Sequence, residues 1–158
     1  MMKKIVYILL LSFYCATGSA QLNSYTFEQA EALSKSNPKP LLVFTYTSWC
    51  KYCEIMKHTT FKNVTIIDVI NKNYYFIPLN AEENRAIVFR DKKFVFKKTG
   101  VKSGVHQLAE ELAGVNGEIV YPTTTILDTK NTILLQQHSL IDAKSLLTIL
   151  ERHKILIK

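Results

Sequence analysis

The stretch Thr47-Ser48-Trp49-Cys50-Lys51-Tyr52-Cys53 decides which fold the sequence predicts. It follows an apolar run, residues 41–46, that is too short for a buried helix and therefore predicts a buried strand. Residues 54–57, which come next, are compatible with a helix. Two cysteines are thus expected where a strand leads into a helix, with Cys50 at the helix N-terminus and Cys53 one turn further on. The free N–H groups and partial positive charge of a helix N-terminus favour thiolate over thiol, so the pair is predicted to be reactive.

Length and composition indicate one globular domain. The 158 residues suffice for one domain with a hydrophobic core and are too few for two domains of typical size. A composition of 47% apolar and 21% charged residues is ordinary for a globular protein. The net charge is +7, but no lysine or arginine cluster alternates with aromatic residues. We therefore predict a solvated basic surface and no nucleic-acid partner.

Residues 1–20 have the pattern of a secretory signal. Lys3 and Lys4 form a positively charged start, and residues 5–16 form an apolar centre. The small residues 18–20 then precede the expected cleavage site. The apolar centre is too short for a permanent membrane anchor, so a cleaved segment is favoured over an anchoring helix.

Cleavage after this segment leaves a single mature domain, residues 21–158, which we expect in the periplasm or outside the cell. Cys15 raises the alternative of cleavage before it and lipid attachment. Phe13 and Tyr14 argue against that alternative, because they are bulky where such processing requires a small residue.

The mature chain would contain only two cysteines, Cys50 and Cys53. A structural disulfide framework in a secreted protein usually has four or more, and a bridge across two residues closes almost no loop and so stabilises little. A redox-active disulfide is therefore favoured over a structural one. His58 could join the pair as a third soft-metal ligand, but no second Cys-x-x-Cys or histidine pair supplies a fourth ligand, so no metal is predicted.

Hydrophobic spacing predicts helices alternating with strands. Thr26 or Ser24 is expected to cap the first helix and Asn63 the third. His106 is expected at the surface or at a helix end rather than in the site. The predicted helices cover residues 27–36, 50–61, 64–71, 105–112 and 142–153, and the predicted strands cover 41–46, 74–79, 121–127 and 132–136.

The order of these elements predicts an α/β fold. Its first half makes a β-α-β unit, and its last two strands are joined by a tight turn, so they must be antiparallel. A central mixed sheet with helices on both faces follows. An insert at about residues 81–114 is predicted to hold a β-hairpin, with strands at 87–89 and 94–96, followed by a helix that Gly114 and Gly117 end.

The chain resembles exported bacterial proteins of the thioredoxin fold, relatives of the C-terminal domain of the thiol:disulfide interchange protein DsbD. The resemblance covers most of residues 25–153 and two departures stand out: Phe44 occupies the usual position of a buried acid that can relay a proton, and residues 21–25 leave little room for the usual first strand. The residues that carry the resemblance are Trp49-Cys50-Lys51-Tyr52-Cys53 with Met56, Thr60-Phe61 and Val64, then Gly104-Val105-His106-Gln107-Leu108-Ala109, and finally Tyr121-Pro122-Thr123.

The resemblance implies roles for the predicted site. Cys50 is expected to be the nucleophile and Cys53 the thiol that resolves the mixed disulfide. Pro122 is expected to follow a cis peptide bond that places the backbone of Tyr121 beside the sulfurs for substrate binding, although an ordinary edge proline remains open. Trp49 is expected to cover the site, with plain packing as its alternative.

Lys51 adds a positive charge beside Cys50 and is expected to lower the pKa of that thiol, unless it is simply an exposed lysine. The whole predicts a monomeric thiol–disulfide oxidoreductase without a bound cofactor, acting on protein disulfides or dithiols. We prefer the reducing direction, which requires electrons from a membrane partner. A dithiol oxidase or isomerase, a metal-handling protein and a binding module remain as alternatives. The insert is hypothesised to border the site and to shape partner choice.

Overall fold

The computed structural model describes residues 20–100 and 103–156. The predicted signal, apart from Ala20, and Cys15 lie outside these described residues. Within the described residues, no helix has both the length and the apolar character needed to cross a membrane.

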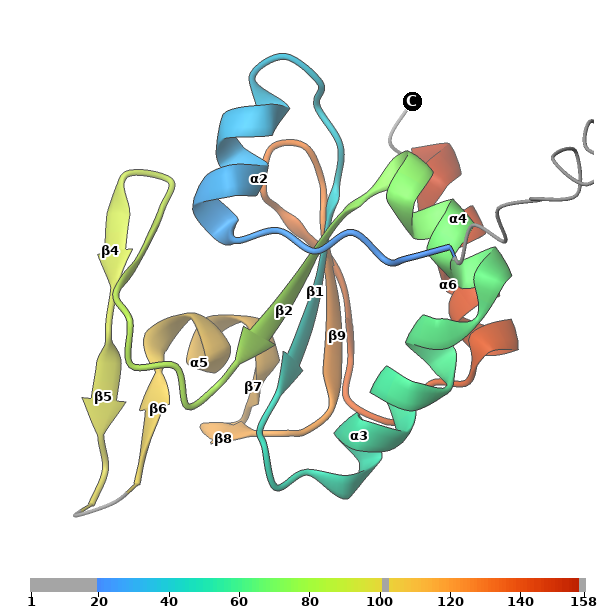
Figure 1. Cartoon of the computed structure of the whole chain (residues 1–158). Helices are drawn as coiled ribbons and strands as arrows, with labels where there is room; N and C mark the ends of the chain where they lie inside the picture. Colours follow the sequence, from blue (N-terminus) through green and yellow to red (C-terminus); the bar gives the residue numbers. More distant parts are fainter. Residues whose placement is uncertain (1–19, 101–102, 157–158) are drawn as a thin grey trace, which may run out of the picture.

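A four-stranded mixed sheet forms the centre of the molecule (Figure 1), in the order β10-β9-β1-β2. The central strand β1 pairs in parallel with β2 and antiparallel with β9, and β10 pairs antiparallel with β9. This arrangement confirms the predicted thioredoxin fold. The four strands are β1 (Leu41–Tyr46), β2 (Tyr75–Asn80), β9 (Thr123–Leu127) and β10 (Ile133–Gln137).

Helices cover both faces of this sheet (Figure 1), as predicted. Helices α2 (Phe27–Ser34) and α5 (Gln107–Ala113) pack on one face. The other face carries α3 (Lys51–His58), the short 3₁₀ helix η1 (Thr60–Lys62), α4 (Val64–Asn73) and α6 (Ala143–Leu156).

Strand β1 is buried on both sides, which explains its unbroken apolar sequence. Leu41 and Val43 point into the core under α2 and α5. Leu42 and Phe44, at the alternate positions, point into the core under α3, α4 and α6. One short strand therefore contributes to both hydrophobic clusters and holds the two layers of helices together.

The predicted helix caps are present. Thr26 and Gln29 form a reciprocal capping box at the start of α2, and the Asn63 side chain accepts a hydrogen bond from the Ile66 N–H at 3.2 Å. Ser24, the alternative cap for α2, instead forms an isolated parallel bridge with Phe76. This bridge is what remains of the usual first strand, for which residues 21–25 were expected to leave little room.

The helix predicted over residues 50–61 is interrupted, and this part of the prediction is wrong. Helix α3 ends at His58, and η1 follows after Thr59. The Thr59 hydroxyl donates to the Ile55 carbonyl at 2.8 Å, and the Thr60 hydroxyl donates to the distant Ile141 carbonyl at 2.7 Å. Threonine hydroxyls that bond to backbone carbonyls compete with the regular helix ladder, and here they end it one turn early.

The insert contains two hairpins where the sequence predicted one. Strand β3 (Ile87–Phe89) pairs with β4 (Lys92–Phe94) across Arg90 and Asp91, which both have positive φ, 56° and 58°. Such a two-residue turn matches the twist of its strands better than the four-residue loop that was expected. Phe96, assigned to the first hairpin, instead begins β5 (Phe96–Lys98), which pairs with β6 (Gly104–His106).

Two further differences follow the second hairpin. The helix predicted from residue 105 begins at Gln107, because β6 continues to His106 and the His106 ring caps α5. Gly114 ends α5 as predicted, but Gly117 lies at φ 86° in the turn of a third hairpin, between β7 (Gly114–Val115) and β8 (Glu118–Ile119). Strands of two residues are too short to leave a periodic signal in the sequence.

His106 links the insert to the central sheet. Its backbone N–H donates to the Ala81 carbonyl at 2.8 Å, just beyond the end of β2. Its ring is fully buried, and Nδ1 accepts a hydrogen bond from the Leu108 N–H at 3.2 Å, so the ring caps α5 in its neutral form. Burial lowers the pKa of His106 below its usual value, and the backbone of Arg85 and the charge of Glu83 oppose this only in part.

The lowered pKa of His106 predicts a loss of stability in mild acid. Below about pH 6.5 the unfolded chain takes up a proton that the folded ring resists. The free energy of unfolding therefore decreases as the pH is lowered, by up to about 1.4 kcal/mol per pH unit. His106→Asn, which keeps a capping side chain but cannot titrate, should lose less stability than the natural protein between pH 7.5 and 5.5. Urea unfolding at both pH values measures this, and an equal loss in the two proteins would contradict the prediction.

Candidate active site

The two cysteines lie where β1 leads into α3, as the sequence predicted. Cys50 is the N-cap of α3, and its Sγ accepts a hydrogen bond from the Cys53 N–H at 3.1 Å. Cys50 and Cys53 form a disulfide, with their Cα atoms 5.2 Å apart. A sulfur in this position lies at the positive end of the helix, where negative charge is stabilised.

The two sulfurs differ in their access to solvent. Cys50 is 6% exposed, whereas Cys53 is 0% exposed. Cys53 lies in the hydrophobic cluster under α3, together with Phe44 and Met56. An incoming molecule can therefore reach Cys50 first, and Cys53 can react only with a group already held at Cys50.

Phe44 fills the position at which the fold usually carries a buried acid. Its ring packs edge-on against Phe61, with centroids 4.8 Å apart, and stacks on Tyr46 at 5.7 Å. On the outer side of Tyr46, the Lys57 ammonium group lies 3.6 Å from the ring centroid. The core beside Cys53 thus contains aromatic rings where a carboxylate would relay a proton.

A carboxylate is present on the solvent side of the site, from a residue that the sequence did not single out. Glu82 accepts a hydrogen bond from the Trp49 indole N–H at 3.0 Å and another from the Ser48 hydroxyl at 3.4 Å. The Glu82 backbone N–H is itself bonded to the Asn80 side chain at 3.0 Å. Its negative charge is therefore fixed beside the two residues that immediately precede Cys50.

Strand register explains how Glu82 reaches the site. Tyr46, the last residue of β1, pairs with Asn80, the last residue of β2, so both strands end at the same edge of the sheet. When two parallel strands end at the same edge of a sheet, the segments that follow them lie close together. The sequence therefore contained a signal for Glu82: polar residues that directly follow the second predicted strand are expected to lie near the cysteine loop.

The segment before β9 reaches the same edge from the other side of β1. The predicted cis peptide bond between Tyr121 and Pro122 is present. The Tyr121 ring meets the Trp49 ring edge to face, with centroids 5.8 Å apart and planes at 90°. Burial, with the negative charge of Glu82 as a second cause, raises the pKa of Tyr121 to about 12, so its hydroxyl stays protonated.

The side chains around the cysteines leave an apolar surface open to solvent. Trp49 is 66% exposed and Tyr52 is 63% exposed, and Ile55 follows on the next turn of α3 at 46%. Lys51, the first residue of α3, is also exposed. An exposed apolar surface beside a reactive group is typical of a site that contacts another macromolecule.

The histidines contact groups other than the sulfurs. His58 is exposed and sits 3.5 Å from a Glu54 carboxylate oxygen. Nδ1 of His138 lies 3.0 Å from the Thr123 hydroxyl, and Nδ1 of His153 lies 2.9 Å from the Ile149 carbonyl oxygen. In the described part of the chain, no three histidine, cysteine or acidic side chains gather closely enough to hold a metal ion.

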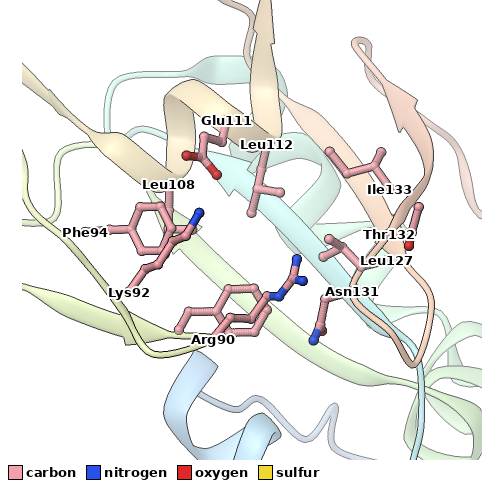
Figure 2. A pocket seen from close by; sticks show the side chains of 11 residues that line it. Arg90, Lys92, Phe94, Leu108, Glu111, Leu112, Leu127, Asn131, Thr132 and Ile133 are labelled. Carbon is pink, nitrogen blue, oxygen red and sulfur yellow. The ribbon is translucent and has the colours of Figure 1, made fainter.

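A separate cavity of about 490 Å³ lies at the opposite end of β1 from the cysteines (Figure 2). Leu127, which lines it, pairs with Leu41 at the start of β1. Figure 2 shows the side chains of Arg90, Lys92 and Glu111 reaching in among apolar side chains. The position of this cavity excludes it from the thiol chemistry.

Comparison with known proteins identifies the family of the fold. The family model described as a thioredoxin-like domain matches residues 27–154. Two curated relatives, the thiol:disulfide interchange proteins DsbD of two Campylobacter jejuni strains, are each 31% identical over 78 residues. The match covers 47% of this chain and 14% of the length of each relative.

Solved structures share the fold at low sequence identity. The oxidoreductase DsbH has a TM-score of 0.61 at 14% identity, covering 89% of this chain and 90% of the other. A thioredoxin from Thermus thermophilus has a TM-score of 0.60 at 15% identity, covering 84% and 87%. A thioredoxin-fold protein from Helicobacter pylori has a TM-score of 0.58 at 20% identity, covering 90% and 81%.

The bond between Glu82 and Trp49 predicts that Glu82 shifts the balance between disulfide and dithiol. Glu82→Gln removes a negative charge that opposes a Cys50 thiolate, so the dithiol form should gain about 1 kcal/mol, or about fivefold in its equilibrium constant with dithiothreitol. Glu83→Gln is the matched control, because Glu83 is equally half-buried but bonds to the Arg85 N–H instead. Free-thiol titration measures both, and equal constants for the two variants would contradict the prediction.

Proposed function

Because the chain belongs to the thioredoxin-like domain family, we propose that it is an exported thiol–disulfide oxidoreductase that reduces protein disulfides. One observation carries the proposal: Cys50 and Cys53 are bonded to each other at the N-terminus of α3, and only Cys50 has an exposed edge. A disulfide that closes so short a loop contributes little to stability, so a reactive role explains its presence better than a structural role.

The reaction begins with the dithiol form. The Cys50 thiolate attacks one sulfur of the partner's disulfide, a mixed disulfide forms, and the partner's other sulfur leaves as a thiolate that takes up a proton. Cys53 then loses its proton and attacks Cys50, which releases the partner's second thiol. Two electrons pass to the partner, and the Cys50–Cys53 disulfide is regenerated in the protein.

The neighbouring residues are proposed to bind the partner. Trp49 and Tyr121 present their rings beside Cys50, and the backbone before Pro122 can pair with an extended segment of the partner. Lys51 places a positive charge next to Cys50 and favours its thiolate. The exposed apolar surface of α3 supports a protein, rather than a small molecule, as the substrate.

The reducing direction is supported by the electrostatics of the site. Glu82 fixes a negative charge on the two residues that precede Cys50, and Phe44 keeps the surroundings of Cys53 apolar. Both features disfavour thiolates in the dithiol form, and a dithiol form that is less stable gives up its electrons more readily. The local similarity to the thiol:disulfide interchange protein DsbD supports thiol–disulfide exchange as the reaction.

Export and the electron donor form one further part of this proposal. Residues 1–20 support export, as does the similarity to a thiol:disulfide interchange protein. A reductase outside the cytoplasm has no reducing glutathione pool to draw on, so a membrane protein would have to regenerate its dithiol. The alternative, a dithiol oxidase or isomerase, would use the same two sulfurs. Lys51 favours this alternative, because its positive charge stabilises a Cys50 thiolate whereas the negative charge of Glu82 destabilises it.

Serine variants separate the roles of the two cysteines. Cys50→Ser should abolish reduction of insulin disulfides by dithiothreitol-fed protein, because no exposed sulfur remains to attack. Cys53→Ser, reduced and then freed of dithiothreitol before it meets its partner, should still attack but should accumulate a mixed disulfide, since the protein has no second thiol to resolve it. Turnover and the trapped adduct are measured by turbidity and by mass spectrometry, and full turnover by either variant would refute the mechanism.

A further inference from the structure

An open groove of about 610 Å³ has Tyr121 among its lining residues. It runs between hairpin β5–β6, which contributes Thr99 and Val105, and hairpin β7–β8, which contributes Glu118 and Ile119. In Figure 1 both hairpins lie toward the end of the sheet at which β1 leads into α3. Most of its lining comes from the two hairpins that the sequence did not predict, and Glu110 and Tyr121 complete it.

The inner end of the groove adjoins the redox site. Tyr121 lines the groove on one side and packs against Trp49 on the other, at 5.8 Å between ring centroids. Trp49 directly precedes Cys50. A polypeptide whose cysteine is held at Cys50 can therefore place its neighbouring residues in the groove.

The groove combines apolar walls with an acidic rim. Val105, Ile119 and Tyr121 are half-buried and pack against the core with part of their surface open. Glu110 on α5 is paired with Lys97 at 2.6 Å, whereas Glu118 is exposed and forms no salt bridge with any residue of the described ranges. Among the described residues, Glu118 is therefore a negative charge without an ion-pair partner beside an apolar surface.

Lysine and arginine side chains match this combination. Each has an aliphatic stem that packs on apolar surface and a charged end that stays in water. In the groove, the stem would lie on Val105, Ile119 and Tyr121 while the charged end meets the carboxylate of Glu118. An acidic residue at the same place would be repelled, and a short polar residue would leave the walls uncovered.

We propose that this groove binds the segment flanking the target cysteine of a protein substrate and selects a lysine or arginine in that segment. The inference rests on the proposed function, since it assigns a substrate class to the same site. The exchange chemistry is unchanged: each turnover converts the protein dithiol and one substrate disulfide into the protein disulfide and two thiols.

The test uses peptides that carry one cysteine in a disulfide with 5-thio-2-nitrobenzoate. The peptides differ only two positions before or after the cysteine, where they have arginine, norleucine or glutamate. Release of the chromophore gives the second-order rate constant of the fully reduced protein, whichever sulfur is attacked. The neutral disulfide 4,4′-dithiodipyridine reports the exchange chemistry itself, because it is too small to occupy the groove and carries no charge.

The natural protein should react up to about fivefold faster with the arginine peptide than with the glutamate peptide on at least one side of the cysteine. The preference should shrink in 0.5 M salt, because salt screens exposed charges. Glu118→Gln should remove most of it and Glu118→Lys should reverse it, with unchanged rates on dithiodipyridine. Glu151→Lys on α6 is the matched control, because Glu151 is equally an exposed acid but lies outside the groove.

Each contrary outcome overturns a different claim. Failure to reduce dithiodipyridine would overturn the proposed function. Normal reduction of dithiodipyridine with equal rates for all peptides would overturn the groove and leave the function intact. A preference for arginine that survives in Glu118→Lys would show that another part of the surface selects the substrate.

Discussion

The pairing of β1 with two different neighbours is the constraint on which the site depends. β1 runs parallel to β2 and antiparallel to β9, so the end of β1, the end of β2 and the start of β9 meet at one edge of the sheet. Because β1 is buried on both faces, its position in the sheet is fixed by both hydrophobic clusters. The packing of the core, rather than the loops that contain the site residues, therefore sets the geometry of the site.

The insert is attached to this same edge. Ala81 donates its N–H to the Tyr46 carbonyl and accepts a hydrogen bond from the His106 N–H, each at 2.8 Å. It thus joins the end of β1 to the start of α5, and the next residue is Glu82, which holds Trp49. A single segment after β2 therefore positions the tryptophan of the site and the hairpins that form the proposed groove. Through this attachment the insert is tied to the segment that leads to the cysteines, as the proposed groove requires.

The sequence predicted those features of the fold that depend on local patterns. The strand before Cys50, the helix caps at Thr26 and Asn63, and the proline-led strand after Tyr121 each leave a signal within a few residues. The mixed sheet followed from their order. The pairing of the cysteines and their position at the helix start followed from the same stretch, and the structure has both.

The features that were missed either are too short to leave a periodic signal or depend on contacts between distant residues. Strands β5 to β8 have two or three residues each, too few for a period to emerge, and they form because partner segments lie beside them. Helix α3 ends early because Thr60 bonds to Ile141, which is 81 positions away. Glu82 joins the site only through the register of two parallel strands.

The reduction potential of the Cys50/Cys53 pair tests the central claim most directly, because it measures the relative stability of disulfide and dithiol on which the direction of reaction depends. The mature protein would be equilibrated in dithiothreitol or glutathione buffers and its free thiols counted. A reductase with Glu82 and Phe44 at its site predicts a potential near that of thioredoxin, about −270 mV. A potential of about −120 to −180 mV would contradict the account and identify an oxidase or isomerase instead.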